Sequence, residues 1–284
     1  MSALAQTAEA QITRHESGGV SYLLSPARAG LPLVLLHGIG SASDSFVPLM
    51  RMIGPARPVL AWDAPGYGAS RALDADWPRA HDYALVLGGL LDALGWERVA
   101  LLGHSLGALT ATQFALLAPK RVVNLTLVSP ALGYAGHPGA PLPAPVAARL
   151  EALERLGPQR FAAERGARLV HRSDERPGIT AAVVDVMSRV SPAGYTQASR
   201  MLACGDLITD AAQLTLPAEI IVGAEDVITP PDNARKLFAA LRAARPGLGH
   251  SLTVIEDAGH AICQEMPESV ALHLARAQNN AGRA

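Results

Sequence analysis

The sequence predicts an α/β protein in which a mostly parallel, doubly wound sheet carries a helical cap insertion. Three observations predict this fold. Short apolar runs bounded by turn residues alternate along the chain with helical stretches, which is typical of parallel sheets covered by helices. The runs themselves do not alternate apolar with polar residues, as expected for strands that are buried on both faces. In one part of the chain, helical patterns follow one another with no strand between them, which predicts an insertion.

Six apolar runs are expected to form the parallel strands, and an earlier run, Val20–Leu24, is expected to add an antiparallel strand at the edge of the sheet. The six runs are Leu33–Leu36, Pro58–Trp62, Val99–Leu102, Val122–Val128, Glu219–Val222 and Leu252–Ile255. The helices that cover the sheet are expected at Arg79–Leu94, Leu106–Leu117, Asp232–Ala244 and Pro267–Ala277.

The insertion begins after the run that ends at Val128. A stretch rich in proline and glycine, Gly133–Pro145, reads as a loop. Val146–Leu156 and Ile179–Val190 then carry apolar residues at helical spacing. Because these helices need a surface to pack on, we expect them to cover the carboxyl edge of the sheet, where ligands bind in open α/β sheets. The predicted division is a core of residues 1–132 and 208–284 with a cap of residues 133–207.

Charge and hydropathy exclude two classes of partner. The 284 residues include 24 Lys and Arg and 25 Asp and Glu without a basic stripe, which argues against nucleic acid. The 21 uncharged residues between Arg98 and Lys120 could cross a bilayer, but a Gly-His-Ser turn near their middle predicts a buried strand and helix, so no membrane partner is expected. Residues 1–14 show no signal-peptide pattern, which favours a cytoplasmic protein. Cys204 and Cys263 are then expected to be free thiols, with one disulfide between them as the alternative.

A serine nucleophile is predicted at Ser105, in the pentapeptide Gly103-His104-Ser105-Leu106-Gly107. The pentapeptide lies between a predicted strand and a predicted helix, which is the context that this pattern requires. Such a turn strains the serine backbone, and its two glycines remove side chains that would collide with the adjacent strand and helix. A plain turn with a serine helix cap is the structural alternative.

The serine hydroxyl needs a base to remove its proton. Among nine histidines, His260 is best placed, because it follows the carboxyl end of a strand and can face the same crevice as Ser105. An acid must orient this histidine. Asp226, which also follows a strand, is the predicted acid, with Glu225 and Asp257 as the other candidates.

Two N–H donors are expected to stabilise the oxyanion formed on attack. One is the backbone N–H of Leu106, next to the nucleophile. The other is the N–H of Ile39, in a loop whose glycines allow close approach to a ligand. His37 and Gly38 of this loop are expected near the substrate, with His37 a structural hydrogen-bonding residue rather than a base. The alternative is a simple strand-ending turn.

Together these segments resemble the α/β-hydrolase superfamily, and among its members the serine-nucleophile ester and lactone hydrolases. Serine, acid and histidine follow in the family's chain order over nearly the whole sequence. The matching segments are His37-Gly38, Asp63-Ala64-Pro65-Gly66-Tyr67-Gly68, Gly103-His104-Ser105-Leu106-Gly107, Asp226 and Gly259-His260. The resemblance implies an α/β-hydrolase fold. It also implies that the loop from Asp63 lines the site in a structural role, without catalysis.

Further segments are similar to 3-oxoadipate enol-lactonases, which open a small carboxylated lactone without metal or cofactor. These segments are Ser191–Ala198 running on to Ala203–Leu207, then Gly223–Asp226 and Thr229–Pro231. No cofactor or metal is therefore expected. The cap is also rich in arginine, with seven arginines against five acids in residues 149–176. One cap arginine could hold a substrate carboxylate in bidentate fashion. Arg189 and Arg200 are the candidates for substrate binding, and solvation of helix surfaces is the alternative role.

The predicted function is thus hydrolysis of a small carboxylic ester or lactone through an acyl-enzyme. A carbon–carbon bond hydrolase of ring-cleavage diketones is the alternative enzyme. That class tends to carry a tryptophan soon after the histidine, where this chain has Ala261-Ile262-Cys263-Gln264. A non-catalytic receptor on the same fold is the third reading, against which the complete set of Ser105, Asp226 and His260 argues. The sequence indicates neither the identity of the substrate nor the oligomeric state.

Overall fold

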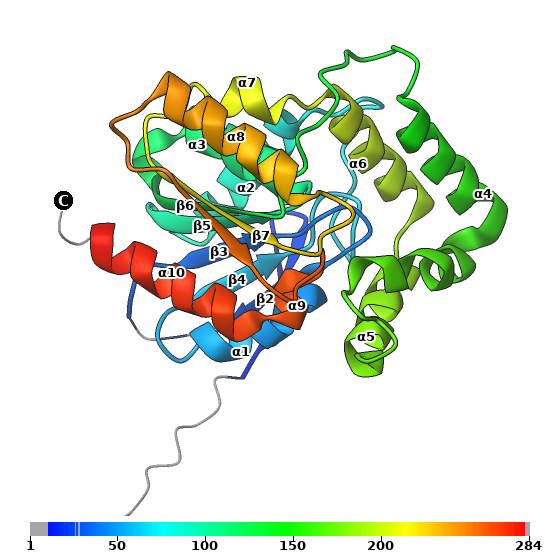
Figure 1. The fold of residues 1–284 in the computed structure, drawn as a ribbon, viewed down its shortest axis with the longest axis horizontal. Coiled ribbons are helices and arrows are strands. Elements are labelled where there is room, and N and C mark those ends of the chain that lie inside the picture. Colours follow the sequence, from blue (N-terminus) through cyan, green and yellow to red (C-terminus); the bar gives the residue numbers. More distant parts are fainter. Residues whose placement is uncertain (1–10, 26, 28, 282–284) are drawn as a thin grey trace, which may run out of the picture.

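A computed structural model of the chain describes residues 11–25, 27 and 29–281, in which one eight-stranded sheet forms the centre (Figure 1). The strand order is β1-β2-β4-β3-β5-β6-β7-β8. The six strands from β4 to β8 run parallel, whereas β1 and β2 pair antiparallel. The strands are β1 (Thr13–Ser17), β2 (Val20–Ser25), β3 (Leu33–Leu36), β4 (Val59–Trp62), β5 (Val99–His104), β6 (Val122–Val128), β7 (Ala218–Gly223) and β8 (Ser251–Ile255).

All seven predicted strands are confirmed, with bounds that differ by two residues at most. The prediction that Val20–Leu24 forms the edge is wrong in one respect. This run is antiparallel as expected, but β1 pairs outside it and takes the edge. The sequence of β1, Thr-Arg-His-Glu-Ser, is polar because the strand is largely exposed. A search for apolar runs cannot find such a strand.

Helices cover both faces of the sheet, as Figure 1 shows. On one face lie α2 (Ala80–Ala93), α3 (Gly107–Leu117), α7 (Leu207–Ala211) and α8 (Pro231–Ala244), and on the other lie α1 (Val47–Ile53) and α10 (Pro267–Ala281). Strand β3 demonstrates the double burial: Val34 and Leu36 belong to one apolar cluster, Leu33 and Leu35 to the other, and all four are fully buried. The absence of alternation in the sequence of β3 follows from this burial on both faces.

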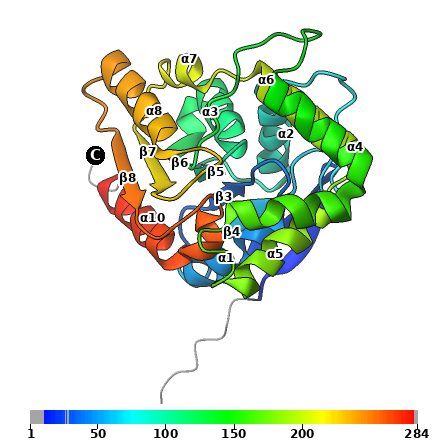
Figure 2. The same cartoon turned by 45° about the vertical axis from the view of Figure 1, so that its right-hand side comes forward.

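The helical insertion lies between β6 and β7 and gathers at one end of the sheet (Figure 2). It contains α4 (Ala144–Arg165), α5 (Pro177–Ser188) and α6 (Pro192–Cys204). At its base, Gly133 and Asp206 form an antiparallel bridge, and the Leu207 N–H donates to the Leu132 carbonyl at 2.9 Å. Since the chain enters and leaves the insertion at these adjacent points, we propose that residues 133–207 form a cap.

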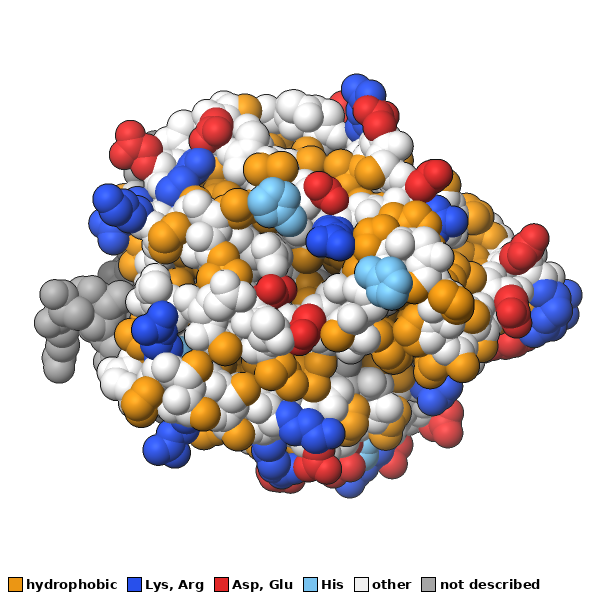
Figure 3. Space-filling view, turned by 90° about the horizontal axis from the view of Figure 1, so that it is seen from above, with side chains coloured by type: hydrophobic (Ala, Val, Ile, Leu, Met, Phe, Trp, Pro, Cys, Tyr) orange, Lys and Arg blue, Asp and Glu red, His pale blue; other side chains and the backbone are white. Residues whose placement is uncertain are grey.

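Two expectations about partners can be compared with the structure. No helix in the described ranges is long and apolar enough to cross a membrane. The uncharged segment between Arg98 and Lys120 is divided between β5 and α3, as predicted. On the face seen in Figure 3, positive and negative side chains are interspersed rather than gathered by sign.

Cys204 and Cys263 are free thiols. Residues 1–10, where a signal peptide was sought, lie outside the described residues.

Candidate active site

Ser105 lies on the tight turn between β5 and α3. Its φ of 53° is in the left-handed region that serine rarely adopts. The turn needs both flanking glycines. A Cβ at Gly103 would lie 2.5 Å from the carbonyl oxygen of Gly107, and a Cβ at Gly107 would lie 2.1 Å from that of Leu36. The prediction that these glycines prevent collisions with the adjacent strand and helix is confirmed, and a strained serine backbone at such a turn is a frequent feature of functional sites.

His260 and Asp226 meet at the same carboxyl edge of the sheet, after β8 and β7. The Nδ1 of His260 lies 2.9 Å from Oδ2 of Asp226, and both residues are buried. Thr229 contacts the two of them, with its hydroxyl 2.9 Å from Oδ2 of Asp226 and 3.1 Å from Nδ1 of His260. Glu225, one of the alternative acids, is exposed. The residue that sequence reasoning missed here is Thr229, which a polar side chain three positions after the acid could have indicated.

Asp226 is held as a carboxylate by its own loop. Its Oδ1 accepts hydrogen bonds from the N–H groups of Ile228 and Thr229, each at 2.8 Å. Burial by itself would raise the pKa of Asp226. His260 and these N–H donors lower the pKa by more than burial raises it, so that it falls to about 2. The loop therefore fixes both the charge of this side chain and which oxygen faces His260.

His104, directly before Ser105, supports His260 from behind. Its Nε2 lies 2.8 Å from the His260 carbonyl oxygen, and the two rings are 4.9 Å apart. Burial and the neighbouring imidazole of His260 lower the pKa of His104 to about 3. A neutral ring therefore donates from Nε2 to that carbonyl. This positioning contact was not predicted, because it joins residues 156 positions apart.

His37 and Gly38 lie in the loop after β3. His37 donates from Nδ1 to the Gly38 carbonyl at 2.8 Å and accepts at Nε2 from the Ala64 N–H at 3.0 Å. Burial lowers the pKa of His37, so the ring is neutral and both nitrogens are used within the protein. Gly38 packs directly on Ser105, since a Cβ at this position would lie 2.8 Å from the Cβ of Ser105.

One cavity of about 280 Å³ contains Ser105 and His260. Ile39 and Leu106, whose N–H groups are the predicted oxyanion donors, line it too. Its wall is otherwise largely apolar and comes from both the core and the cap. The larger apolar side chains in this wall, besides Ile39 and Leu106, are Leu132, Leu169, Met187, Leu202 and Ile228. Residues of the helical insertion thus complete a small enclosure over the carboxyl ends of the strands, which suits a small organic ligand.

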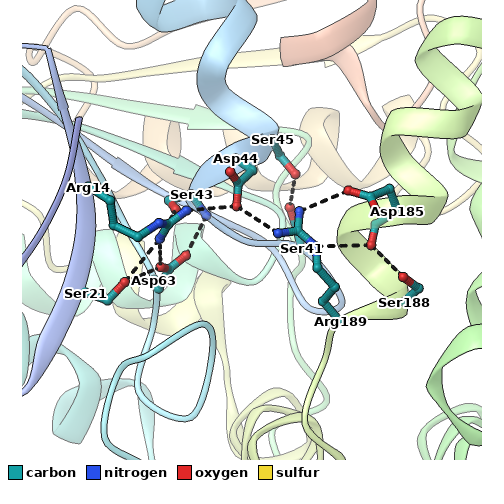
Figure 4. A network of polar contacts seen from close by, with 10 residues as sticks. All are labelled: Arg14, Ser21, Ser41, Ser43, Asp44, Ser45, Asp63, Asp185, Ser188 and Arg189. Carbon is teal, nitrogen blue, oxygen red and sulfur yellow. Dashed lines mark hydrogen bonds and ion pairs between the residues drawn. The ribbon is translucent and has the colours of Figure 1, made fainter. Parts of the chain in front are cut away.

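The structure places Arg189 and Arg200 outside the lining of this cavity. Arg189 pairs with Asp185 at 3.2 Å and with Asp44 at 3.6 Å, which joins α5 to the core (Figure 4). Arg200 donates to the Asp76 carbonyl at 2.7 Å and lies over an aromatic ring of the core. Two other cap arginines, Arg149 and Arg165, line the cavity instead.

Asp63 lies in the same polar network as Arg189 (Figure 4) and lines a separate cavity of about 240 Å³. It is fully buried and pairs with Arg14 at 2.6 Å. Burial raises the pKa of Asp63, but hydrogen bonds from Ser21 and the Ser43 N–H lower it below its ordinary value overall. Because these bonds join distant parts of the core, the Asp63 carboxylate stabilises the fold.

A buried carboxylate ties the cap to the loop that carries His260. Glu265, in α9 (Ile262–Glu265), accepts from the N–H groups of Gly259 at 3.1 Å and His171 at 2.9 Å. It also pairs with Arg176 at 3.0 Å. Arg176 in turn pairs with Asp257 and donates to its carbonyl at 3.0 Å. We call these five residues the Glu265 clamp. Asp257, an alternative acid in the sequence, is used here.

Comparison with known proteins gives a consistent result. The model of the alpha/beta hydrolase family matches residues 33–272. An uncharacterized protein of Mycobacterium tuberculosis is 30% identical over 250 residues, covering 82% of this chain and 71% of that protein. A 2-hydroxy-6-oxo-6-phenylhexa-2,4-dienoate hydrolase of Comamonas testosteroni is 36% identical over 121 residues, which are 41% of this chain and 42% of that enzyme. The solved enol-lactonase of Burkholderia xenovorans has a TM-score of 0.80 at 21% identity, covering 94% of this chain and 100% of that one.

Proposed function

We propose that this chain, which belongs to the alpha/beta hydrolase family, is a serine hydrolase that cleaves a small carboxylic ester or lactone. In this proposal Ser105 is the nucleophile, His260 is the base and Asp226 is the acid that orients the histidine. Ile39 and Leu106 supply the oxyanion donors. One of the similar proteins is a hydrolase by name, and another is an enol-lactonase.

One observation carries the proposal. Ser105 and His260 line the same cavity, while Asp226 occupies the other side of the imidazole at 2.9 Å from Nδ1. Because Nδ1 is engaged by a carboxylate, Nε2 is the nitrogen left to accept a proton from a serine in the cavity. This division of roles between the two ring nitrogens is what a serine, histidine and aspartate mechanism requires.

The proposed reaction has two halves. Ser105 Oγ attacks the substrate carbonyl as His260 takes its proton, and Asp226 stabilises the imidazolium that forms. The N–H groups of Ile39 and Leu106 hold the oxyanion, and the alcohol leaves with the proton from His260. Water then gives its proton to the same histidine and attacks the acyl-enzyme, which releases the acid and restores Ser105. A lactone would yield acid and alcohol on one molecule.

A carbon–carbon bond hydrolase is the second candidate. The similarity to the dienoate hydrolase of Comamonas testosteroni favours it, because that enzyme is 36% identical over its matching 121 residues. That match covers less than half of this chain. The two candidates share the fold and the three central residues, so they differ in which substrates turn over.

Two measurements test the proposal. A fluorophosphonate probe should label the protein and should fail to label Ser105→Ala. A panel of short p-nitrophenyl esters, enol-lactones, acyl-homoserine lactones and vinylogous diketones should then show turnover of esters or lactones. Turnover of the diketones alone would favour the second candidate. Absence of labelling in the unmodified protein would contradict a serine nucleophile altogether.

A further inference from the structure

Two arginines of the cap line the cavity that holds Ser105, and no aspartate or glutamate of the described chain lines it. Arg149 and Arg165 lie sixteen positions apart in α4, near its first and last turns. A straight helix would hold them about 24 Å apart at 1.5 Å per residue. The helix is broken at Gly157, where φ is 69°, directly before Pro158. This break lets both ends of α4 border one cavity.

Neither arginine is neutralised within the part of the chain that the structure describes. The Nε–H of Arg149 donates to the Pro145 carbonyl of its own helix at 3.1 Å, which leaves its terminal amino groups for other partners. Arg165 lies over the Phe161 ring at 5.3 Å and forms no ion pair with a described residue. By comparison, Arg189 pairs with two aspartates.

The two positive charges act on each other and on one tyrosine of the cavity. Burial lowers the pKa of Arg165, and the charge of Arg149 lowers it further. Burial raises the pKa of Tyr195, and both arginines oppose that rise. Tyr195 packs edge-on against Phe161 with ring centres 5.5 Å apart, the same ring that carries Arg165. Arg165 and Tyr195 therefore meet at the Phe161 ring, and both of them line the cavity together with Arg149.

We infer that Arg149 and Arg165 form a subsite for a carboxylate of the substrate, which makes the preferred substrates anionic esters or lactones. This inference rests on the proposed function of the same cavity. Like charges that are partly removed from water repel each other, and a bound carboxylate offsets this repulsion. A carboxylate also accepts two parallel hydrogen bonds from a guanidinium group. The apolar wall described above then accommodates the carbon skeleton between this subsite and Ser105.

The test compares two substrates that differ in one charge. The first is the mono-p-nitrophenyl ester of glutaric acid, and the second is its neutral methyl ester. The unmodified enzyme should hydrolyse the first with a kcat/KM at least about tenfold higher. Arg149→Met and Arg165→Met should each lower that kcat/KM by about tenfold to hundredfold, which is the range for a lost charge-assisted hydrogen bond. The neutral substrate should change less than about threefold.

A matched control removes an arginine from the same helix. Arg160 is exposed in α4 and does not line the cavity, so Arg160→Met should leave both substrates unaffected. Binding provides a second readout that does not need turnover. Glutarate should bind the Ser105→Ala variant in calorimetry, and its affinity should fall about tenfold or more when either cavity arginine is also replaced.

The outcomes separate this inference from the proposed function. Equal rates on both substrates, with Ser105 labelled by the fluorophosphonate, would overturn the carboxylate subsite and leave the hydrolase intact. Failure of labelling would refute the hydrolase, and glutarate binding would then decide on the subsite alone. Binding of inorganic phosphate without binding of glutarate would overturn the assignment to a carboxylate.

Discussion

Replacing Asp226 by asparagine should abolish most activity without disturbing the shape of the site. The reason lies in the two N–H groups of Ile228 and Thr229, both of which donate to Oδ1 at 2.8 Å. An asparagine must place its carbonyl oxygen there, since its NH₂ group would face two donors. Its NH₂ group is then forced toward Nδ1 of His260 and donates to it. The imidazole must therefore carry its proton on Nε2, which is the wrong tautomer for a base.

The expected loss in kcat/KM is about 10³- to 10⁴-fold, as a wrong tautomer costs in enzymes of this mechanism. That loss corresponds to about 4–5.5 kcal/mol of transition-state stabilisation. The charge effect alone points the same way, because His260 is a main cause of the depression of the Asp226 pKa to about 2. By reciprocity, the carboxylate stabilises the imidazolium that forms during the reaction.

The assay is hydrolysis of a short p-nitrophenyl ester, together with the rate of fluorophosphonate labelling. Glu225→Gln is the matched control, because it removes the neighbouring carboxylate, which is exposed. The control should retain activity within about threefold, as expected for a surface substitution away from the site. A loss below about tenfold in Asp226→Asn would refute the tautomer argument. An equal loss of activity in Glu225→Gln would contradict the assignment of Asp226 as the acid.

Three further predictions concern the surroundings of this site. Gly38→Ala should lower kcat/KM by more than about 100-fold, because the new methyl group would lie 2.8 Å from the Cβ of the nucleophile; Gly89→Ala, which meets nothing within 4 Å, is its control. His104 should make the protein less stable at lower pH, because its pKa of about 3 in the folded state lies below its pKa in the unfolded chain. The unfolded chain therefore binds a proton first as the pH falls, and the free energy of unfolding should decrease by about 1.5 kcal/mol between pH 6.5 and pH 5. Denaturant titrations of His104→Gln should show that the free energy of unfolding changes less with pH over this range. An unchanged pH dependence would mean that other groups cause it. Arg176→Met should lower the free energy of unfolding by about 3 kcal/mol, because it leaves the buried Glu265 carboxylate without its cation; the loss should be smaller at low pH, where that carboxyl is protonated. The control Arg172→Met, at an arginine that is 56% exposed, should lower it by less than about 1 kcal/mol. Equal shifts in Tm for the two variants would contradict the clamp.

Local pattern accounts for the parts of the molecule that could be predicted. A run such as Val99–Leu102 is apolar because both sheet faces are covered, so burial is visible in the letters themselves. The carboxyl ends of parallel strands then meet at one edge, which is why Asp226 and His260 could be expected to meet from loops far apart in the chain. The glycines at positions 103 and 107 report the close approach of backbone to backbone.

Features that depend on the direction of a side chain could not be predicted. Arg189 and Arg149 have the same chemistry, but packing turns the first toward Asp44 and leaves the second at the cavity. The break at Gly157, which allows α4 to border the cavity twice, is a single glycine before a proline. The role of Glu265 could not be predicted either. It does not directly follow a strand, and its partners come from three segments of the fold that no local pattern brings together.

The Glu265 clamp has a consequence for how such enzymes can diversify. His171 and Arg176 belong to the proposed cap, but they hold the loop of His260. A chimera that exchanges residues 133–207 for the cap of another hydrolase would also exchange two of the groups that satisfy Glu265. The graft would leave Glu265 buried with the Gly259 N–H as its remaining partner from this clamp, in the loop that carries His260. An exchange at the two chain crossings should therefore retain activity only when the incoming cap brings an equivalent cation and N–H donor. Substitution within the cap should accordingly change specificity at a smaller cost in stability than replacement of the whole cap.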